Sequence, residues 1–220
     1  MAMKLMMVEG RYKGKIDLSN LDTSMLPGTV GLATTVQFLD YIDEITNYIE
    51  SKGIKIFIDR ARQKYEGQVL GCDAGSSDKI KDKVDAFLYV GSGRFHPLGV
   101  RGKKIYALDI ERMKVEEVDT SALEKRRYAN IYNAKDARTF AILVTTKKGQ
   151  NELLEKAEVL KKRIEENGRI AFTLVMNEIN DANLLGIRAD AFVNTACPRI
   201  VEDHFSKPII NAEDLDKVLE

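Results

Sequence analysis

Two cysteines are the residues of this chain best suited to chemistry, and each lies in a loop bracketed by glycine or proline. Cys72 lies in GQVLGCDAG, where Gly71 and Gly75 let the backbone approach whatever the sulfur holds, and Cys197 lies in TACPR, directly before Pro198. A single buried cysteine is usually a small apolar packing residue. Two cysteines in comparable loops favour metal ligation, although two thiolates are fewer than the three or four typical of a structural zinc or an iron–sulfur cube.

Polar side chains near these loops are the next candidates. Arg94 and Arg199 occupy matched positions after two predicted strands, and the forked guanidinium can bind a carboxylate through two hydrogen bonds. His96 and His204 could each add a metal ligand, although packing or exposure is the commoner fate of a histidine. Gln150, near a predicted helix start, either binds a ligand or is simply exposed, and we favour the first.

These residues belong to a pattern that occurs twice. Thr34-Thr35 corresponds to Thr145-Thr146, and Asp85-Ala86-Phe87 corresponds to Asp190-Ala191-Phe192. Internal repeats imply similarly folded domains, and ligands of parallel α/β units bind beyond the carboxyl ends of the strands. The threonine loops end where a helix begins, so their hydroxyls either cap that helix or hold an anion. We therefore expect the two copies to share one strand order and to present their loops to a common site.

The elements that position these loops alternate between apolar strands and helices. Strands are expected at 29–34, 54–58, 86–90 and 104–108 in the first copy, and at 140–144, 170–175, 191–194 and 208–210 in the second. Helices are expected at 37–51 and 151–166, a charged connector at 113–119, a further helix at 124–137, and an orphan strand at 4–8. Continuous apolar strands alternating with helices predict parallel sheets covered on both faces.

The predicted fold class is therefore α/β, with two similar domains that each contain a small parallel sheet flanked by helices. We place an N-terminal strand and linker at 1–27, a domain carrying Cys72 at 28–117, and a domain carrying Cys197 at 118–220. A chain of 220 residues that is 44% apolar can fill two cores of this size.

The charge balance and the hydropathy of the sequence indicate which partners the protein binds and where in the cell it works. Lys and Arg together number 34, as do Asp and Glu, so a direct nucleic-acid or anionic-membrane role has little support. No apolar run approaches the ~20 residues of a membrane span, and the start has no signal-peptide pattern. We expect a cytoplasmic protein with reduced thiols.

Several ordered motifs resemble a known family. GQVLGCD, the strand ending in GSGRFHPLG, the TTKKGQ loop and NTACPRI resemble the archaeal diphthamide biosynthesis enzymes, over the chain after about residue 20. The resemblance implies a 4Fe-4S cluster held by one cysteine from each of three α/β domains. It also implies a radical transferase that cleaves S-adenosylmethionine to a 3-amino-3-carboxypropyl radical, which adds to a histidine of elongation factor 2. By motif, Cys72 and Cys197 are then cluster ligands, and Gln150 and Arg199 contact the methionine portion of S-adenosylmethionine.

The chain departs from that family by lacking its first, cysteine-bearing domain. We therefore expect an enzyme that is incomplete alone, working as a homodimer or with a partner chain that supplies the missing domain. The alternative is a non-catalytic subunit or paralogue that stabilises a catalytic partner or docks elongation factor 2. A plain nucleotide-binding protein is disfavoured because no GxGxxG loop follows a first strand.

Overall fold

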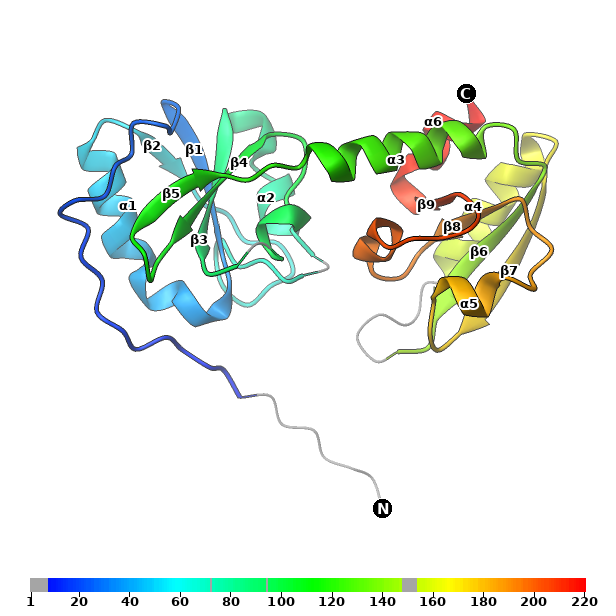
Figure 1. Ribbon diagram of the computed structural model, residues 1–220, viewed down its shortest axis with the longest axis horizontal. Coiled ribbons are helices and arrows are strands. Elements are labelled where there is room, and N and C mark those ends of the chain that lie inside the picture. Colours follow the sequence, from blue (N-terminus) through cyan, green and yellow to red (C-terminus); the bar gives the residue numbers. More distant parts are fainter. Residues whose placement is uncertain (1–7, 72, 94, 148–153) are drawn as a thin grey trace, which may run out of the picture. The chain divides into compact units, whose positions relative to one another are not determined.

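The computed structural model describes residues 8–71, 73–93, 95–147 and 154–220. The chain divides into two compact units, with the boundary between Asp119 and Thr120. Each unit has an α/β fold built on one sheet (Figure 1). Among the described residues, no helix combines the length and the apolar character that crossing a membrane would require.

The first unit contains a five-stranded sheet with the order β2-β1-β3-β4-β5. The strands are β1 (Thr29–Thr34), β2 (Lys55–Phe57), β3 (Ala86–Gly91), β4 (Lys104–Asp109) and β5 (Lys114–Glu117). The first four are parallel, and β5 pairs with β4 in the antiparallel direction. Every residue of the central strand β3 is buried, as expected for a parallel strand covered on both faces.

Short helices connect these strands. They are η1 (Val36–Tyr41), α1 (Ile42–Ser51), α2 (Gly75–Asp78), η2 (Lys81–Lys83) and η3 (Pro97–Gly99). Helix α1 buries Ile42, Ile45 and Ile49, whose spacing places them on one face of a helix. The opposite face of the sheet is tightly packed at Gly31, where a Cβ would lie only 2.5 Å from the ring of Phe87. A larger residue there would have to displace that ring.

The second unit contains a fully parallel sheet with the order β7-β6-β8-β9. Its strands are β6 (Thr139–Thr145), β7 (Ile170–Met176), β8 (Ala191–Asn194) and β9 (Ile209–Asn211). Its helices are α3 (Ser121–Ala134), α4 (Leu154–Glu166), α5 (Asp181–Leu184), η4 (Pro198–Glu202), η5 (Ala212–Asp214) and α6 (Leu215–Leu219). Two apolar clusters form its core, one including Phe140 and Ile164 and the other including Phe192 and Leu184.

The predicted repeat is confirmed at the level of strand order. When β1, β2, β3 and β4 are matched with β6, β7, β8 and β9, both sheets have the same order and the same parallel pairing. The repeated aspartate has a structural reason. The carboxylate of Asp85 accepts from the Thr29 hydroxyl at 2.5 Å, and the carboxylate of Asp190 accepts from the Thr139 N–H at 2.9 Å. Each aspartate therefore joins the start of the third strand to the start of the first.

One expectation about the elements needs correction, and two others fall partly outside the described residues. Residues 113–119 are not only a charged connector, because 114–117 form β5 and give the first sheet an antiparallel edge. The strand expected at 4–8 lies outside the described residues except for Val8, which has no regular secondary structure. Helix 151–166 is described from Leu154 onward.

Candidate functional site

The second unit has a pocket at the carboxyl end of its sheet that contains Cys197. The pocket has a volume of about 170 Å³ and is lined by Thr145, Lys147, Asn177, Ile179, Cys197 and Ile200. These residues lie at or after the ends of β6, β7 and β8, where parallel sheets bind ligands. Cys197 is a free, half-buried thiol, so its sulfur can both face a ligand and be shielded from bulk water.

The loop that carries Cys197 is held by two buried asparagines. The Asn194 side-chain amide donates to the carbonyl of Cys197 at 2.9 Å and to Oδ1 of Asn211 at 2.8 Å, while its own Oδ1 accepts from the Ala196 N–H at 3.0 Å. The Asn211 amide donates to the carbonyl of Pro198 at 3.0 Å. Asn194 and Asn211 are 1% and 2% exposed, so this network fixes the backbone on both sides of the sulfur.

A second set of polar contacts holds the loop opposite the cysteine. The Thr145 hydroxyl donates to the carbonyl of Asn177 at 3.3 Å and accepts from the Lys147 N–H at 3.2 Å. The Thr146 hydroxyl donates to Oδ1 of Asn177 at 3.5 Å. The side chain of Lys147 reaches Glu178 at 3.6 Å in an exposed ion pair. The repeated threonines of this unit thus join the ends of neighbouring strands.

Arg199, predicted to contact the substrate, is already engaged within its own helical turn. Its Nε donates to Glu202 at 2.5 Å, and the side chains of Arg199 and Glu202 are 13% and 16% exposed. The carbonyl of Glu202 also accepts from Arg126. Among the described residues, Arg199 is not one of those that line the pocket. The Arg199 guanidinium can bind a ligand only if it binds Glu202 at the same time or breaks its ion pair with Glu202.

The corresponding edge of the first unit is more fully covered by its own chain. Thr34 exchanges backbone hydrogen bonds with Gly67 and Val69, and its hydroxyl donates to the carbonyl of Val90 at 2.8 Å. The hydroxyl of Thr35 makes no helix-capping bond, so capping by this threonine is not observed. Leu70 and Asp73 exchange backbone hydrogen bonds at 2.9 and 3.2 Å. Cys72 falls in the sequence between them and lies outside the described residues, as do Arg94 and Gln150.

The histidines have ordinary surroundings. His96 stacks on Tyr89 with ring centroids 6.1 Å apart and meets the edge of Phe95 at 5.3 Å. Burial raises the pKa of Tyr89, although a hydrogen bond with Thr35 partly offsets this effect. His204 is exposed. Over the ranges that the structure describes, no group of three or more His, Cys, Asp or Glu side chains is placed to hold a metal ion.

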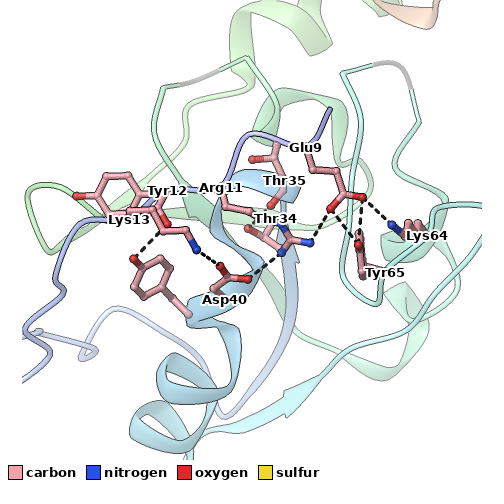
Figure 2. A network of polar contacts seen from close by, with 10 residues as sticks. Glu9, Arg11, Tyr12, Lys13, Thr34, Thr35, Asp40, Lys64 and Tyr65 are labelled. Atoms are coloured by element: carbon pink, nitrogen blue, oxygen red, sulfur yellow. Dashed lines mark hydrogen bonds and ion pairs between the residues drawn. The ribbon is translucent and has the colours of Figure 1, made fainter. Parts of the chain in front are cut away.

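An extended N-terminal segment crosses the first unit just after its strand-end threonines (Figure 2). The Tyr12 N–H donates to the carbonyl of Gln37 at 2.8 Å, and Arg11 pairs with Asp40 at 2.9 Å. The nearby Glu9 carboxylate also accepts from Arg11, at 2.8 Å. The segment is therefore fastened beside η1. At the equivalent strand end of the second unit, Thr145 and Lys147 line the Cys197 pocket.

Three donors converge on Glu9 at the end of this segment (Figure 2). They are Lys64 Nζ at 2.8 Å, the Tyr65 hydroxyl at 3.0 Å, and Arg11. Hydrogen bonds from Lys64, Arg11 and Tyr65, in that order of importance, lower the pKa of the Glu9 carboxyl to about 2. The attachment is therefore electrostatic and most complete when Glu9 is ionised.

Sequence reasoning identified the two strand-end loops but missed the residues that support them. Asn194 and Asn211 were not candidates, because a polar residue at a strand end has no sequence signal that distinguishes support from exposure. Asn177 and Lys147 had a partial signal, since each lies within two residues of the end of an apolar strand at the ligand-binding edge.

Comparison with known proteins agrees with this architecture. A family described as "Putative diphthamide synthesis protein" matches residues 7–220. The 2-(3-amino-3-carboxypropyl)histidine synthase of Pyrococcus horikoshii is 33% identical over 196 residues, which are 86% of this chain and 56% of that protein. Subunit 1 of the Caenorhabditis elegans synthase is 27% identical over 201 residues, covering 86% of this chain and 50% of the relative.

A solved structure has the same fold. The crystal structure of Dph2 from Pyrococcus horikoshii matches with a TM-score of 0.76 and 32% identity, covering 89% of this chain and 58% of that one. A second crystal structure of that protein, with a 4Fe-4S cluster, matches equally well. The chain therefore belongs to the diphthamide synthesis protein family, as its motifs indicated. It spans about half the length of the curated relatives it matches.

Proposed function

We propose that this chain is the part of a 3-amino-3-carboxypropyl transferase that contributes Cys197 and Cys72 to a 4Fe-4S cluster. One observation carries the proposal: Cys197 is a free thiol in a strand-end pocket, on a backbone fixed by buried asparagines. Thiolate is the usual protein ligand of iron–sulfur clusters, so the donor type fits such a cluster. The family membership of the chain and the cluster-bound relative support this choice.

The proposed reaction transfers a carbon chain from S-adenosylmethionine to a histidine of elongation factor 2. When bound, the cluster would supply the electron that breaks a sulfur–carbon bond of the sulfonium. That cleavage leaves a neutral thioether and a 3-amino-3-carboxypropyl radical. The radical would form a carbon–carbon bond with the imidazole. The ring would then become aromatic again by losing one proton to water and one electron, which the oxidised cluster would take back, so that no external oxidant is consumed.

The residues of this chain bind and position the reactants in this scheme. Asn194 and Asn211 hold the Cys197 loop at a fixed position, and Thr145 fixes the facing loop. Cys197 is half-buried, so a group bound to its sulfur would be partly shielded from water. Gln150 and Arg199 stay predicted contacts of the methionine portion, and Arg199 would first have to part from Glu202.

A second candidate function is a subunit that is not catalytic alone. This candidate is favoured by the number of cysteines in the 220-residue sequence, which is two. Two thiolates leave a cube under-ligated. A homodimer, or a partner chain that supplies a third cysteine, would then complete the site, and elongation factor 2 would be the protein substrate.

Product analysis separates the two candidates. The 220-residue chain is incubated anaerobically with dithionite, S-adenosylmethionine and elongation factor 2, alone and with a separately expressed cysteine-bearing domain added in trans. We expect little thioether from the chain alone, and both thioether and a modified histidine once the domain is added. Cys197→Ser should abolish both products. Absence of both products from the complemented wild-type chain would refute a catalytic role.

A further inference from the structure

Helix α3 of the second unit exposes two aromatic side chains that do not pack into its core. Tyr128 and Tyr132 are 59% and 75% exposed, although an aromatic ring contributes most to stability when it is buried. They lie four residues apart and therefore on one face of the helix. Other residues form the core-facing side of α3, since Ile131 and Ala134 are buried in an apolar cluster. Both rings are therefore accessible from solvent.

Basic side chains flank these two rings. Lys125 lies on the same face of α3, as does Lys135 at the C-cap, because the spacing 125, 128, 132 and 135 confines four side chains to an arc of about 80°. Lys217 of α6 lies over the ring of Tyr128, with its Nζ 5.8 Å from the ring centroid. Aromatic rings interleaved with cations on one helix face are typical of a surface that binds an anionic partner.

The basic residues continue beyond the end of α3. An open pocket of about 450 Å³ is lined by Lys135, Asp136, Ala137, Arg138, Gly168, Arg169 and Ile170. Over the part of the chain that the structure describes, the head groups of Lys125, Lys135 and Arg138 make no hydrogen bond or ion pair. The Arg169 guanidinium donates from Nη2 to the carbonyl of Val218 at 3.3 Å, and it has no carboxylate partner among the described residues. None of these four charges is therefore neutralised by an ion pair with a described residue.

Carboxylates are fewer than cations on this part of the surface. Glu124 lies at the edge of the same helix face, and Asp136 lines the pocket. These two acids stand beside four cations that have no ion pair with a described residue, and beside Lys217. A local excess of positive charge raises the concentration of acidic groups near it and orients an acidic partner as it approaches.

This basic surface and the Cys197 pocket lie at opposite ends of the second sheet. Arg138 and Arg169 directly precede β6 and β7, whereas the Cys197 pocket lies at or after the carboxyl ends of these strands. Strand β6 has seven residues, so the two ends are about 23 Å apart. A small molecule bound at Cys197 cannot reach the basic surface, whereas a protein bound there can.

We propose that an acidic segment of the protein substrate docks on a surface centred on α3, at the end of the unit away from Cys197. This α3 surface comprises Lys125, Tyr128, Tyr132, Lys135 and Arg138. The inference rests on the proposed function, since it takes elongation factor 2 to be the protein substrate. Tyrosine and arginine are enriched among the residues that dominate binding between proteins, and cations on one protein select acidic groups on the other. A nucleic acid is less favoured, because Lys and Arg in the whole chain do not outnumber Asp and Glu.

Binding of elongation factor 2 to the 220-residue chain, measured by isothermal titration calorimetry, tests the α3 surface. Tyr132→Ala should weaken binding about tenfold, as loss of an aromatic anchor does at a protein interface. The double variant Lys135→Gln, Arg138→Gln should also weaken binding about tenfold at low ionic strength, and its difference from the wild type should shrink as salt is added. In the chain complemented with a cysteine-bearing domain, Tyr132→Ala should raise KM for elongation factor 2 with little effect on kcat.

Matched variants on α4 serve as controls. Val159→Ala shortens an exposed apolar side chain, and Lys162→Gln removes an exposed lysine; neither should change the affinity for elongation factor 2. Tyr132→Phe should retain most of the affinity, because the ring is kept. All these side chains are exposed, so each variant should unfold in urea at the same midpoint as the wild type.

The possible results separate the docking inference from the proposed function. If the α3 variants bind and modify elongation factor 2 as well as the wild type does, the docking inference is wrong while the proposed function stands. If the variants lose affinity for single-stranded RNA but not for elongation factor 2, the proposed ligand is wrong and the inference fails. If the variants lose affinity for elongation factor 2 but the complemented wild-type chain forms no product, the docking surface stands and the catalytic role fails. If the wild-type chain does not bind elongation factor 2, the inference fails together with the proposed protein substrate.

Discussion

Asn194→Ala is the substitution that most directly tests how the fold supports Cys197. The change removes the bonds from Asn194 to the Cys197 carbonyl, to Asn211 Oδ1 and from the Ala196 N–H. Each hydrogen bond contributes roughly 0.5–1.5 kcal/mol net, and buried partners left unpaired add to the loss. We therefore expect the second unit to lose about 2–4 kcal/mol of unfolding free energy in urea.

A control and a second readout distinguish general destabilisation from a loosened cysteine loop. Asn183→Ala removes one exposed bond, to the carbonyl of Glu178 at 3.0 Å, and should cost less than about 1 kcal/mol. In a Cys72→Ser background, where Cys197 is the only thiol, Asn194→Ala should speed alkylation of that thiol under native conditions. Stability and alkylation rates equal to those of the Asn183→Ala control would refute the supporting role of Asn194.

Two further predictions concern other parts of the fold. Arg127→Ala should lower the unfolding free energy of the second unit in urea by about 2–3 kcal/mol. The reason is that Asp214, which is 1% exposed, loses a partner that binds its carboxylate through two hydrogen bonds, at 2.5 and 2.7 Å. A loss below about 0.5 kcal/mol would contradict this prediction. The contribution of Glu9 to holding the N-terminal segment should be present above its usual pKa of 4.5 and fade as the pH falls toward 2. Hydrogen exchange of the Tyr12 amide, corrected for intrinsic rates, should therefore be less protected at pH 3 than at pH 6, and unchanged protection would count against the Glu9 attachment.

A strand order shared by the two units could be predicted from the sequence, because the same pattern of apolar strands and polar loops occurs twice. Continuous apolar runs, each followed by a polar loop, are distinctive for parallel strands, and Asp85 and Asp190 marked equivalent points in both copies. The antiparallel strand β5 was missed because KVEE buries only Val115, so its sequence looks like a solvated connector. Its pairing with β4 depends on tertiary contacts that local periodicity does not contain.

The site was only partly predictable for a similar reason. Loop location follows from topology, so Cys197 could be placed at a ligand-binding edge. The partner of Arg199 could not be predicted, because its pairing with Glu202 depends on the 3₁₀ turn that begins at Pro198. The sequence predicted arginine as a carboxylate ligand, and the structure adds that its guanidinium is already paired with Glu202.

Iron and acid-labile sulfide content after anaerobic reconstitution tests the central claim most directly. The wild-type 220-residue chain should bind iron and sulfide in equal amounts but below full cluster occupancy, because its sequence supplies two thiolates. Cys72→Ser and Cys197→Ser should each remove most of that iron, and a cysteine-bearing domain added in trans should raise wild-type occupancy toward four irons per chain. Iron content that is unaffected by Cys197→Ser would contradict the assignment of this pocket as a cluster site.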